Sequence, residues 1–593
     1  MAGRLNLPDT RAWRGLPWLA LAVVVVFAGT GLLPQAGYHL NIVMQAVTYA
    51  IGVTGLVVVL GYCGQISLAQ AAFFGLGAYG VGIGTTDFGL PFVVALAAGV
   101  GLATVFGVVL GFASLRLGGH YLAMVTISFQ QILTLVLANW IGLTHGPDGV
   151  KNIPRPVMPS FLGSFSFERG DRYLALCMAV LAGVIWYAWR LRGSRLGRAM
   201  QAVRDNEIAA STCGINTYAT KVVAFAVSAL LGGLGGGLFS GAFAYISPDQ
   251  FTFGESIVLL TMALLGGVQS PFGALLGTSL LVILPESLRF LKLIYLAVYG
   301  AAVILIMVFL PEGLWGFVAN RLRRVAPPPE GAVAPLPLLA QTGMDSVEIA
   351  LAITGLAKHF GGLKALDGVD VAVRRGTVHA RIGPNGSGKS TFINVVTGLY
   401  RPTAGRIVLA GRDVTGTSPH ARVRMGLART FQNIRVFRGM TVLENVMVGA
   451  ERPGNDVAGD PAAVVQRALA ALDFVGLRAD ANRPVGTLSY GYQRYVEIAR
   501  ALAGSPHVLL LDEPAAGLNL SEKHELGLLL RRLKGHGLTV LIVDHDMTLV
   551  EQVADHITVL NFGRRIADGV PREALGHPDV IAAYLGEPRD AAA

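Results

Sequence analysis

The stretch Gly383-Pro384-Asn385-Gly386-Ser387-Gly388-Lys389-Ser390 decides the fold of the C-terminal part of this chain. It matches the P-loop pattern G-x-x-x-x-G-K-[ST]. Residues 378–382 (Val-His-Ala-Arg-Ile) predict a short strand before it, and residues 391–397 predict the start of a helix after it. A strand, a glycine-rich loop and a helix in this order point backbone N–H groups and a helix N-terminus at phosphate. The stretch therefore predicts a nucleotide-binding α/β domain.

Two side chains of this loop have a predicted chemical task. Lys389 would reach the β- and γ-phosphates, and the Ser390 hydroxyl would hold Mg²⁺. The other residues that we expect around the phosphates are Gly383, Asn385, Gly386, Ser387, Gly388 and Thr391. Four fixed positions also match by chance in unrelated proteins, so the surrounding sequence has to decide what the loop means.

The composition of the first half is that of a membrane protein. Charged residues make up 14% of the 593 residues and hydrophobic ones 53%, whereas soluble domains carry about 25% charge. Between Pro17 and Leu115 the only charged residue is Asp87. Because one transmembrane helix needs about 20 apolar residues, this stretch alone predicts about four spans.

Further apolar runs follow this stretch. They cover roughly residues 121–142, 173–190, 218–244, 254–285 and 290–310. Gly266-Gly267 and Ser270-Pro271 interrupt the run 254–285, which predicts two short helices or one discontinuous helix. We expect a polytopic α-helical membrane domain of about 8–10 spans, with about ten favoured.

Arginine clusters at the ends of the apolar runs predict which loops are cytoplasmic. The clusters are Arg4, Arg11 and Arg14; Arg190, Arg192, Arg195, Arg198 and Arg204; and Arg321, Arg323 and Arg324. The first apolar run has no clear small-x-small cleavage site, so we expect a retained helix, not a secretory signal. The clusters also explain the net charge of +10. They follow span ends and form no single basic face, which argues against a nucleic-acid partner.

A proline-rich segment separates the two halves. Residues 325–346 hold Pro327-Pro328-Pro329, Pro335 and Pro337 among small residues, which is typical of an extended linker. We therefore expect a transmembrane permease domain over 1–324, the linker over 325–346 and an α/β nucleotide-binding domain over 347–593. The three cysteines, Cys63, Cys177 and Cys213, are too few and too scattered for a zinc site or a disulfide framework.

Further motifs follow the P-loop. Val508-Leu509-Leu510-Leu511 predicts a buried strand that ends in Asp512-Glu513. Asp512 would hold Mg²⁺ through water, and Glu513 would orient or deprotonate the attacking water. Leu488-Ser489-Tyr490-Gly491-Tyr492-Gln493-Arg494 lies before this strand, and a second strand at 539–543 leads into Asp544-His545-Asp546. Alone, Ser489 is an ordinary helix N-cap and His545 an ordinary loop residue; the order and spacing of all four motifs favour a common function.

In this order the motifs make residues 347–590 resemble the ATP-binding domain of ABC transporters. The resemblance implies that 383–390 is the Walker A loop and 489–493 the signature motif. It also implies that Ser489 and Gly491 face the γ-phosphate and that Phe360 lies against adenine.

The same resemblance implies the catalytic and metal residues. Glu513 would be the catalytic base, His545 the switch histidine, and Gln432, in Arg-Thr-Phe-Gln-Asn at 429–433, the Q-loop glutamine. Asp512 would be the Walker B aspartate, so that Mg²⁺ would be held by Ser390, Gln432 and Asp512. The cofactors implied are ATP and Mg²⁺.

The chain departs from the family pattern at four positions. Tyr490 and Tyr492 stand in the signature motif where Gly and Gln are commoner, and Asn519 replaces an aspartate that is common in the D-loop. Arg381 lies in the strand before the P-loop, where an aliphatic residue is expected. Because a buried unpaired arginine is costly, we expect Arg381 to find a partner or to reach the surface.

Both halves are similar to one branch of this family, the branched-chain amino acid importers, as a fused permease and ATP-binding protein. The segments in the ATPase half are 360–366, 428–432 and 581–586, and those in the permease half are 64–79, 119–126, 145–149 and 265–273. The glycine-rich permease segments also suit close packing of helices through small residues.

The resemblance implies a multi-subunit importer in the bacterial cytoplasmic (inner) membrane, with the ATPase domain in the cytoplasm. The partners would be a second permease subunit, a second ATPase subunit and an extracytoplasmic solute-binding protein, in a lipid bilayer. The cargo would be leucine, isoleucine or valine. Alternatives are another small polar solute (urea, an amide or an aromatic acid) and, in another class, an ATP-gated channel or regulator.

We expect the loop 197–217 to hold a short helix, and the resemblance implies that this helix docks on the ATPase. Asp205 would cap this helix and Gly214 would end it.

Overall fold

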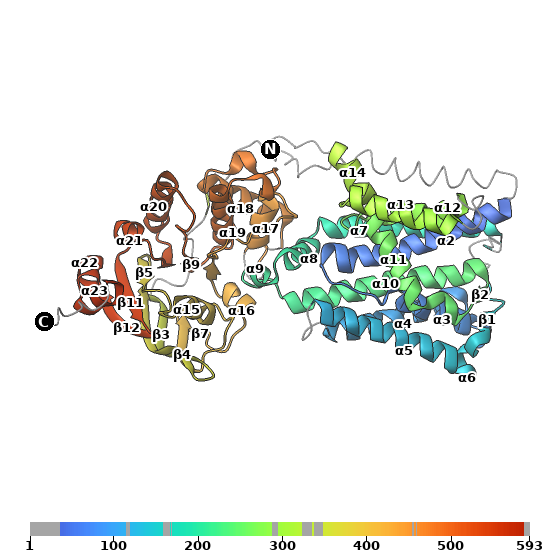
Figure 1. Ribbon diagram of the computed structural model, residues 1–593, viewed down its shortest axis with the longest axis horizontal. Helices are drawn as coiled ribbons and strands as arrows, with labels where there is room; N and C mark the ends of the chain where they lie inside the picture. The colour runs from blue at the N-terminus through green and yellow to red at the C-terminus, as the bar shows by residue number, and fades with distance from the viewer. Residues whose placement is uncertain are drawn as a thin grey trace. The chain divides into compact units, whose positions relative to one another are not determined.

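The computed structural model describes residues 36–113, 119–157, 167, 169–287, 294–322, 335–336, 348–452, 456–457 and 459–585 (Figure 1). These residues form two compact units. The helical unit holds the described residues of 36–204 and 217–322. The α/β unit holds those after 324 together with the inner segment Asp205–Asn216. The exact domain boundaries expected above stay a prediction.

The helical unit consists of apolar helices joined by short segments. Its helices are α2 (Ala36–Leu56), continued by a π-helical turn η2 (Val57–Tyr62), α3 (Gln70–Thr86), α4 (Phe92–Ala113), α5 (His120–Asn139), α6 (Ile141–Thr144), α7 (Gly170–Arg192), α8 (Arg195–Asp205), α10 (Thr217–Phe243), α11 (Phe253–Gly266), α12 (Pro271–Ser287), α13 (Tyr295–Phe309) and α14 (Gly313–Leu322). A two-residue antiparallel ladder joins β1 (Val150–Lys151) to β2 (Tyr245–Ile246).

Five helices of the described residues are long and apolar enough to cross a membrane, or up to seven spans if each bent pair counts as one. The bent pair α11 and α12 turns by 118°, so the run 254–285 is two helices. The first predicted span, near residues 17–33, lies outside the described residues. The described part of the chain thus supports a polytopic helical domain and holds fewer spans than the favoured number of about ten.

Helix α10 is the centre of the helical unit and packs on α2, α3 and α4 (Figure 1). Glycines allow this close approach: a Cβ on Gly77 would lie 1.9 Å from the carbonyl oxygen of Gly233, and one on Gly236 would lie 1.8 Å from that of Phe74. These distances leave no room for any side chain. Packing of backbone against backbone through small residues is how membrane helices associate without a hydrophobic driving force.

Polar side chains hold the N-terminus of α3, which begins after the break at 63–69. Gln130 Oε1 of α5 accepts the N–H of Ala72 at 2.6 Å, and Ser256 Oγ of α11 accepts that of Ala71 at 3.1 Å. Ser256 also donates to Gln130 Oε1 at 3.0 Å. The first N–H groups of a helix have no partner within it, so these side chains satisfy a helix end that is buried among apolar helices.

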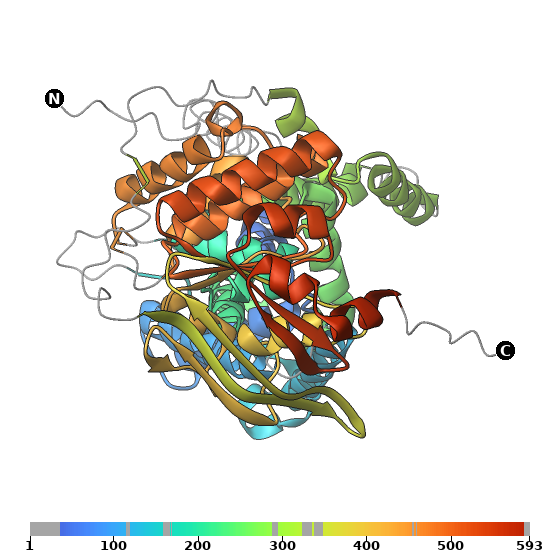
Figure 2. The ribbon, with the colours of Figure 1, turned by 90° about the vertical axis from the view of Figure 1, so that its left-hand side faces the viewer.

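The α/β unit contains two sheets. The six-stranded sheet has the order β12-β11-β5-β10-β9-β8, and the four-stranded antiparallel sheet has the order β4-β3-β6-β7. The strands are β3 (Ile349–Phe360), β4 (Leu363–Arg374), β5 (Val378–Ile382), β6 (Ala404–Leu409), β7 (Arg412–Asp413), β8 (Leu427–Arg429), β9 (Val508–Asp512), β10 (Thr539–Val543), β11 (His556–Asn561) and β12 (Arg564–Gly569). Figure 2 shows β3 and β4 as a long twisted pair.

The helices of this unit pack on the strands and on one another. They are α15 (Lys389–Val396), α16 (Pro419–Arg424), α17 (Val442–Ala450), α18 (Pro461–Phe474), α19 (Tyr490–Ala503), α20 (Leu520–Gly535), α21 (Met547–Val553), α22 (Pro571–Leu575) and α23 (Pro578–Leu585). Phe392 of α15 belongs to the core on one sheet face, with Leu541 and Val543 of β10. Leu526 of α20 and Ile542 belong to the core on the other face.

Strands β5, β9 and β10 are buried at every residue and pair in parallel. Near-continuous apolar runs are typical of parallel strands that helices cover on both faces, and the predictions of these strands are confirmed. Because parallel strands end at the same edge, the P-loop, Asp512-Glu513 and Asp544-His545 all emerge there. The expected α/β P-loop class is also confirmed.

The glycine contacts of α10 give a test of the helical unit. Gly236→Val should destabilise it by about 3 kcal/mol, because the branched side chain would have to displace the backbone of α3. The measurement is the melting temperature of the full chain in detergent. Gly183→Val in α7 is the matched control, since a Cβ there meets nothing within 4 Å. Equal melting of both variants would show that the α3–α10 contact is not tight.

Candidate functional site

The P-loop connects β5 to α15 and folds around its own lysine. Lys389 Nζ donates to the carbonyl oxygens of Gly383 at 2.6 Å and Pro384 at 2.9 Å. Gly388 precedes α15 with φ +95, and a Cβ there would lie 2.4 Å from the carbonyl oxygen of Ala365, so both conformation and space require glycine. Burial lowers the pKa of Lys389. The charge of nearby Glu513 raises this pKa, and the charge of Arg381 lowers it further. The ammonium is thus fixed at the N-terminus of a helix, where anions bind.

The predicted catalytic residues come together at the ends of β9 and β10. Gln432 Nε2 donates to Glu513 Oε2 at 2.8 Å, and His545 Nδ1 lies 3.5 Å from the same oxygen. Glu513 has φ +44, a conformation that costs a non-glycine residue free energy and is concentrated at functional sites. Its N–H donates to the carbonyl of Val543 at 2.7 Å, which ties this conformation to β10.

Asp544 positions the loop that carries His545. Its fully buried carboxylate accepts the backbone N–H groups of His545 at 2.7 Å and Asp546 at 3.0 Å through Oδ1. Oδ2 accepts the N–H of Ala515 at 3.3 Å, after the end of β9. Sequence reasoning did not assign Asp544 a role; the signal was a carboxylate directly after a fully buried strand.

Arg429 of β8 is a second residue that sequence reasoning missed. Its Nη2 lies 3.0 Å from Asp512 Oδ2, and both side chains are buried. Nη1 donates to Asn394 Oδ1 at 2.8 Å and to Thr397 Oγ1 at 3.1 Å, at the far end of α15. Arg429 therefore orients Asp512 and links it to the helix that follows the P-loop.

The signature residues lie at the N-terminus of α19, next to that of α20. Ser489 Oγ accepts the N–H of Tyr492 at 3.5 Å, as an N-cap does. A Cβ on Gly491 would lie 2.6 Å from Oε1 of Glu522. Asn519 caps α20 and exchanges hydrogen bonds of 2.9 Å with Glu522 in a capping box. Asparagine therefore keeps the capping geometry at this departure from the family pattern.

Phe360 ends β3 with its ring partly exposed. It packs edge-to-face against Tyr400 with 5.5 Å between ring centroids, and Lys358 Nζ lies 4.9 Å from the Phe360 centroid. The exposed ring suits stacking on a planar base. Tyr400, which supports this ring, was not predicted from the sequence.

Arg381 finds a partner that is aromatic, and it does not reach the surface. Its side chain is fully buried, and none of its three guanidinium nitrogens has a hydrogen-bond partner within the described residues. The guanidinium carbon lies 3.4 Å from the ring centroid of Phe392. The contact is a cation–π interaction, which leaves the N–H groups without acceptors.

The inner segment Asp205–Asn216 packs within the α/β unit, and its helix is α9 (Glu207–Ser211). Asn206, not Asp205, caps this helix: Asn206 Oδ1 accepts the N–H of Ala209 at 2.9 Å. Asp205 ends α8, and its Oδ2 accepts the N–H of Gly439 at 2.7 Å. Asp205 is therefore committed to another segment. The helix ends at Ser211 with Thr212 as its C-cap, and Gly214, the expected end, lies three residues further on with φ +88.

Arg435 joins this segment to the stretch that carries Gln432. Its Nη1 donates to Asn206 Oδ1 at 3.1 Å, and its backbone N–H donates to the buried Glu497 of α19 at 3.3 Å. Arg494 Nη2 of α19 donates to the carbonyl of Gln432 at 2.8 Å. Residues 431–435 thus contact Glu513, α19 and the α9 segment.

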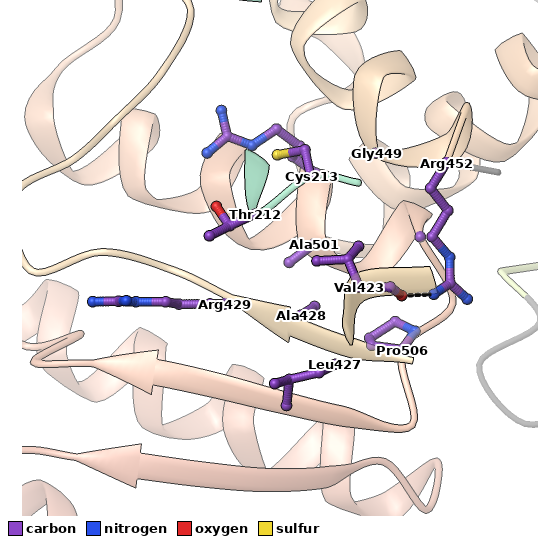
Figure 3. A pocket seen from close by; sticks show the side chains of 12 residues that line it. Thr212, Cys213, Val423, Leu427, Ala428, Arg429, Gly449, Arg452, Ala501 and Pro506 are labelled. Carbon is purple, nitrogen blue, oxygen red and sulfur yellow. Dashed lines mark hydrogen bonds between the residues drawn. The ribbon is translucent and has the colours of Figure 1, made fainter. Parts of the chain in front are cut away.

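A cavity of about 20 Å³ lies beside the end of α9 (Figure 3). Thr212 and Cys213 line it together with Val423, Leu427 and Arg500. This volume has room for about one water molecule, so the contact is close-packed.

Comparisons with known proteins identify both halves. Residues 38–310 match the family described as branched-chain amino acid transport system / permease component, 366–516 match ABC transporter, and 564–590 match branched-chain amino acid ATP-binding cassette transporter. The chain is 45% identical over 249 residues to the high-affinity branched-chain amino acid transport ATP-binding protein BraF of Pseudomonas aeruginosa, covering 98% of that protein and 40% of this chain. It is 41% identical over 251 residues to LivG of Escherichia coli K12, again covering 98% of that protein and 40% of this chain. The chain belongs to the branched-chain amino acid ATP-binding cassette transporter family.

Among solved structures, a nucleotide-free ATP-binding cassette from an ABC transporter is 37% identical, with 41% of this chain and 100% of that chain covered and a TM-score of 0.37. The chain is thus a membrane protein in which a permease domain and an ABC ATPase domain share one polypeptide. The ATPase domain implies ATP binding and an ATPase coupled to transport. The family places the chain in a multi-subunit importer.

The cluster around Glu513 can be tested by separating binding from turnover. Glu513→Gln should keep ATP binding and slow hydrolysis by at least about 10²-fold, because the base is lost. Lys389→Ala should abolish ATP binding. Both are measured as ATP binding and phosphate release in the assembled complex. Glu551→Gln, at an exposed position of α21, is the control and should hydrolyse ATP normally. Near-normal hydrolysis by Glu513→Gln would contradict the assignment.

Proposed function

We propose that this chain is the fused permease and ATPase of an importer that uses ATP to move branched-chain amino acids across the bacterial cytoplasmic (inner) membrane. One observation carries the proposal: a permease of the branched-chain family and a complete set of ATPase residues lie in one chain. The high-affinity branched-chain amino acid transport proteins that the ATPase half resembles support leucine, isoleucine or valine as cargo.

In the proposed reaction, Glu513 is the general base for the attacking water. Gln432 and His545 both contact Glu513 Oε2 and so orient the carboxylate that takes the proton. The P-loop N–H groups and Lys389 bind the phosphates. Phe360 stacks on the adenine. Ser489 and Gly491 act on a nucleotide held by the partner's P-loop.

The residues proposed for Mg²⁺ fit that ion. They are Ser390, Gln432 and Asp512, which offer a hydroxyl, an amide and a carboxylate oxygen, the hard donors that Mg²⁺ prefers. Because Gln432 uses its amide nitrogen on Glu513, its Oε1 is left for a cation. Asp512 is held in place by Arg429. When bound, Mg²⁺ neutralises charge on the β- and γ-phosphates.

The proposal requires further subunits. Each chain carries one P-loop and one signature helix, whereas the family sandwiches each nucleotide between the P-loop of one domain and the signature of another. We therefore propose a second ATPase subunit and a second permease subunit in the bilayer. An extracytoplasmic solute-binding protein would deliver the cargo. No nucleic-acid partner is proposed.

We further propose that the α9 segment transmits the state of the nucleotide site. Residues 431–435 carry Gln432, which contacts the catalytic glutamate, and Arg435, which contacts Asn206. A shift of Gln432 on nucleotide binding or hydrolysis would thus move the segment that leads into α8 and α10. A small local displacement becomes a large one when it moves a packed element as a whole.

Uptake measurements test the cargo. Deleting the gene should abolish high-affinity uptake of leucine, isoleucine and valine, and restoring the wild-type chain should recover it. The Glu513→Gln chain is the control that should fail to restore accumulation against a gradient. Retained uptake of all three, with loss of urea or aromatic-acid uptake, would reassign the cargo. Restoration by Glu513→Gln would favour a channel.

The Arg435–Asn206 contact gives a test of coupling. Arg435→Met removes the side-chain donor and leaves the backbone bonds of residue 435, so ATP binding should survive. Stimulation of ATPase activity by the loaded binding protein, and uptake, should fall together. Ala209→Pro should have the same effect, because it removes the N–H that Asn206 caps and costs about 3 kcal/mol of local helix stability.

Both quantities are measured side by side in reconstituted vesicles. Arg438→Met, three positions along at an exposed site, is the matched control and should behave like the wild type. Full stimulation and uptake in a folded Ala209→Pro chain would mean that the α9 segment transmits nothing.

A further inference from the structure

Arg381 is a buried cation without a polar partner, placed directly behind the P-loop. It lies two residues before Gly383, the first residue of the loop, and its guanidinium packs on Phe392, three residues after Lys389. In the sheet it is paired with Val543 of β10 on one side and Thr558 of β11 on the other. Arg381 is therefore linked to both ends of the loop, and among the described residues it meets no carboxylate and is shielded from solvent.

The polar side chain paired with Arg381 in the sheet is already occupied. Thr558 donates its hydroxyl to Asp568 Oδ1 at 2.6 Å and is bonded to His379 Nε2 at 2.9 Å. Burial is the sole cause that lowers the pKa of Arg381, so no acidic group opposes it. A guanidinium in this position is desolvated and uncompensated, which destabilises the folded protein.

Arg422 shows what a compensated buried arginine looks like in the same unit. It is equally buried, at the other end of α15, where Nη1 donates to the carbonyls of Val395 and Val396 at 2.6 Å and Nη2 to that of Thr415 at 2.9 Å. The Val395 and Val396 carbonyls form the negative end of the helix. Arg381 instead lies against the N-terminal half of α15. This is the positive end of the helix, so it raises the free energy of burying the guanidinium charge.

We propose that Arg381 is a positioning residue of the nucleotide site: its unpaired charge, fixed on Phe392 behind the P-loop, is compensated by the bound polyphosphate and strengthens binding of the more highly charged nucleotide. The proposal rests on the proposed ATP-binding function. Its basis is the location of the charge, since Arg381 acts electrostatically on Lys389 itself. Without bound phosphate the same charge destabilises the fold, so one side chain couples folding to nucleotide binding.

The test uses the purified full chain in nanodiscs with Arg381→Met, which removes the charge and keeps the length. In EDTA, the Kd for ATP should rise by about tenfold or more, and the Kd for ADP by a smaller factor, because the effect scales with ligand charge. A higher salt concentration should reduce both increases in Kd, but by less than it would for an exposed charge, because a buried charge is screened less. The nucleotide-free melting temperature should rise, since an uncompensated buried charge is gone.

Two control variants separate charge from packing. Arg422→Met makes the same substitution at the buried arginine of α16 and should lower the melting temperature while leaving the ratio of ATP to ADP affinity unchanged. His379→Leu lies on the same face of β5; burial and nearby His556 lower the pKa of His379 to about 4, so it is neutral at pH 7.5. It too should leave the affinity ratio unchanged. Arg381→Leu repeats the test if the methionine variant is poorly folded.

Each outcome decides the matter. A graded loss of affinity with a raised melting temperature supports the proposal. Unchanged affinities, equal losses for ATP and ADP, or a lowered melting temperature overturn it, because they make Arg381 a packing residue. Failure of the wild-type chain to bind ATP would instead overturn the proposed function.

Discussion

The parallel pairing of β5, β10 and β9 is the constraint on which the nucleotide site depends. Val543 lies beside Arg381 on one side and beside Asp512 on the other. Because the three strands end together, the residues that follow them meet at one edge of the sheet, and no other structural element is needed to bring them there. The bond from Glu513 N–H to the carbonyl of Val543 extends this pairing by one residue and holds Glu513 at positive φ. A register slip of one residue would separate Glu513 from Gln432 and turn every buried side chain to the other face.

Sequence patterns predicted the elements of the α/β unit well because the relevant signals are local. Runs such as Val508–Asp512 have one stable environment, a parallel strand covered on both faces. The P-loop backbone has positive φ at Gly386 and Gly388, which glycine adopts without strain. Contacts between distant segments had no such signal: Arg429 meets Asp512 across 83 residues and Arg435 meets Asn206 across 229. The cap of α9 was misassigned for the same reason, since Asp205 and Asn206 are equally good caps until Gly439 engages one of them.

In the helical unit, composition predicted the type of structure but few of the contacts that hold it together. Composition predicted apolar helices and glycine-mediated contacts, because few structures other than membrane helices tolerate such sequences. It predicted the break in the run 254–285, but neither the 118° angle between α11 and α12 nor the polar contacts of Gln130 and Ser256 with the start of α3. Both follow from breaks in helices. Breaks are tolerated at membrane depth only where the freed N–H groups find partners inside the protein, and partners from other helices leave no trace in local sequence.

Buried charge distinguishes structural from functional positions in the α/β unit. Arg494 and Arg500 are buried on either side of Glu497, and Arg422 is surrounded by carbonyls. In each case the protein supplies the compensation, so these arginines are explained by the fold alone. Arg381 breaks this rule, and it does so in the strand that leads into the phosphate loop. Sequences that fold to one structure satisfy local rules nearly everywhere and break them mainly where function requires it. The location of this exception, and not its cost alone, therefore gives it a functional meaning.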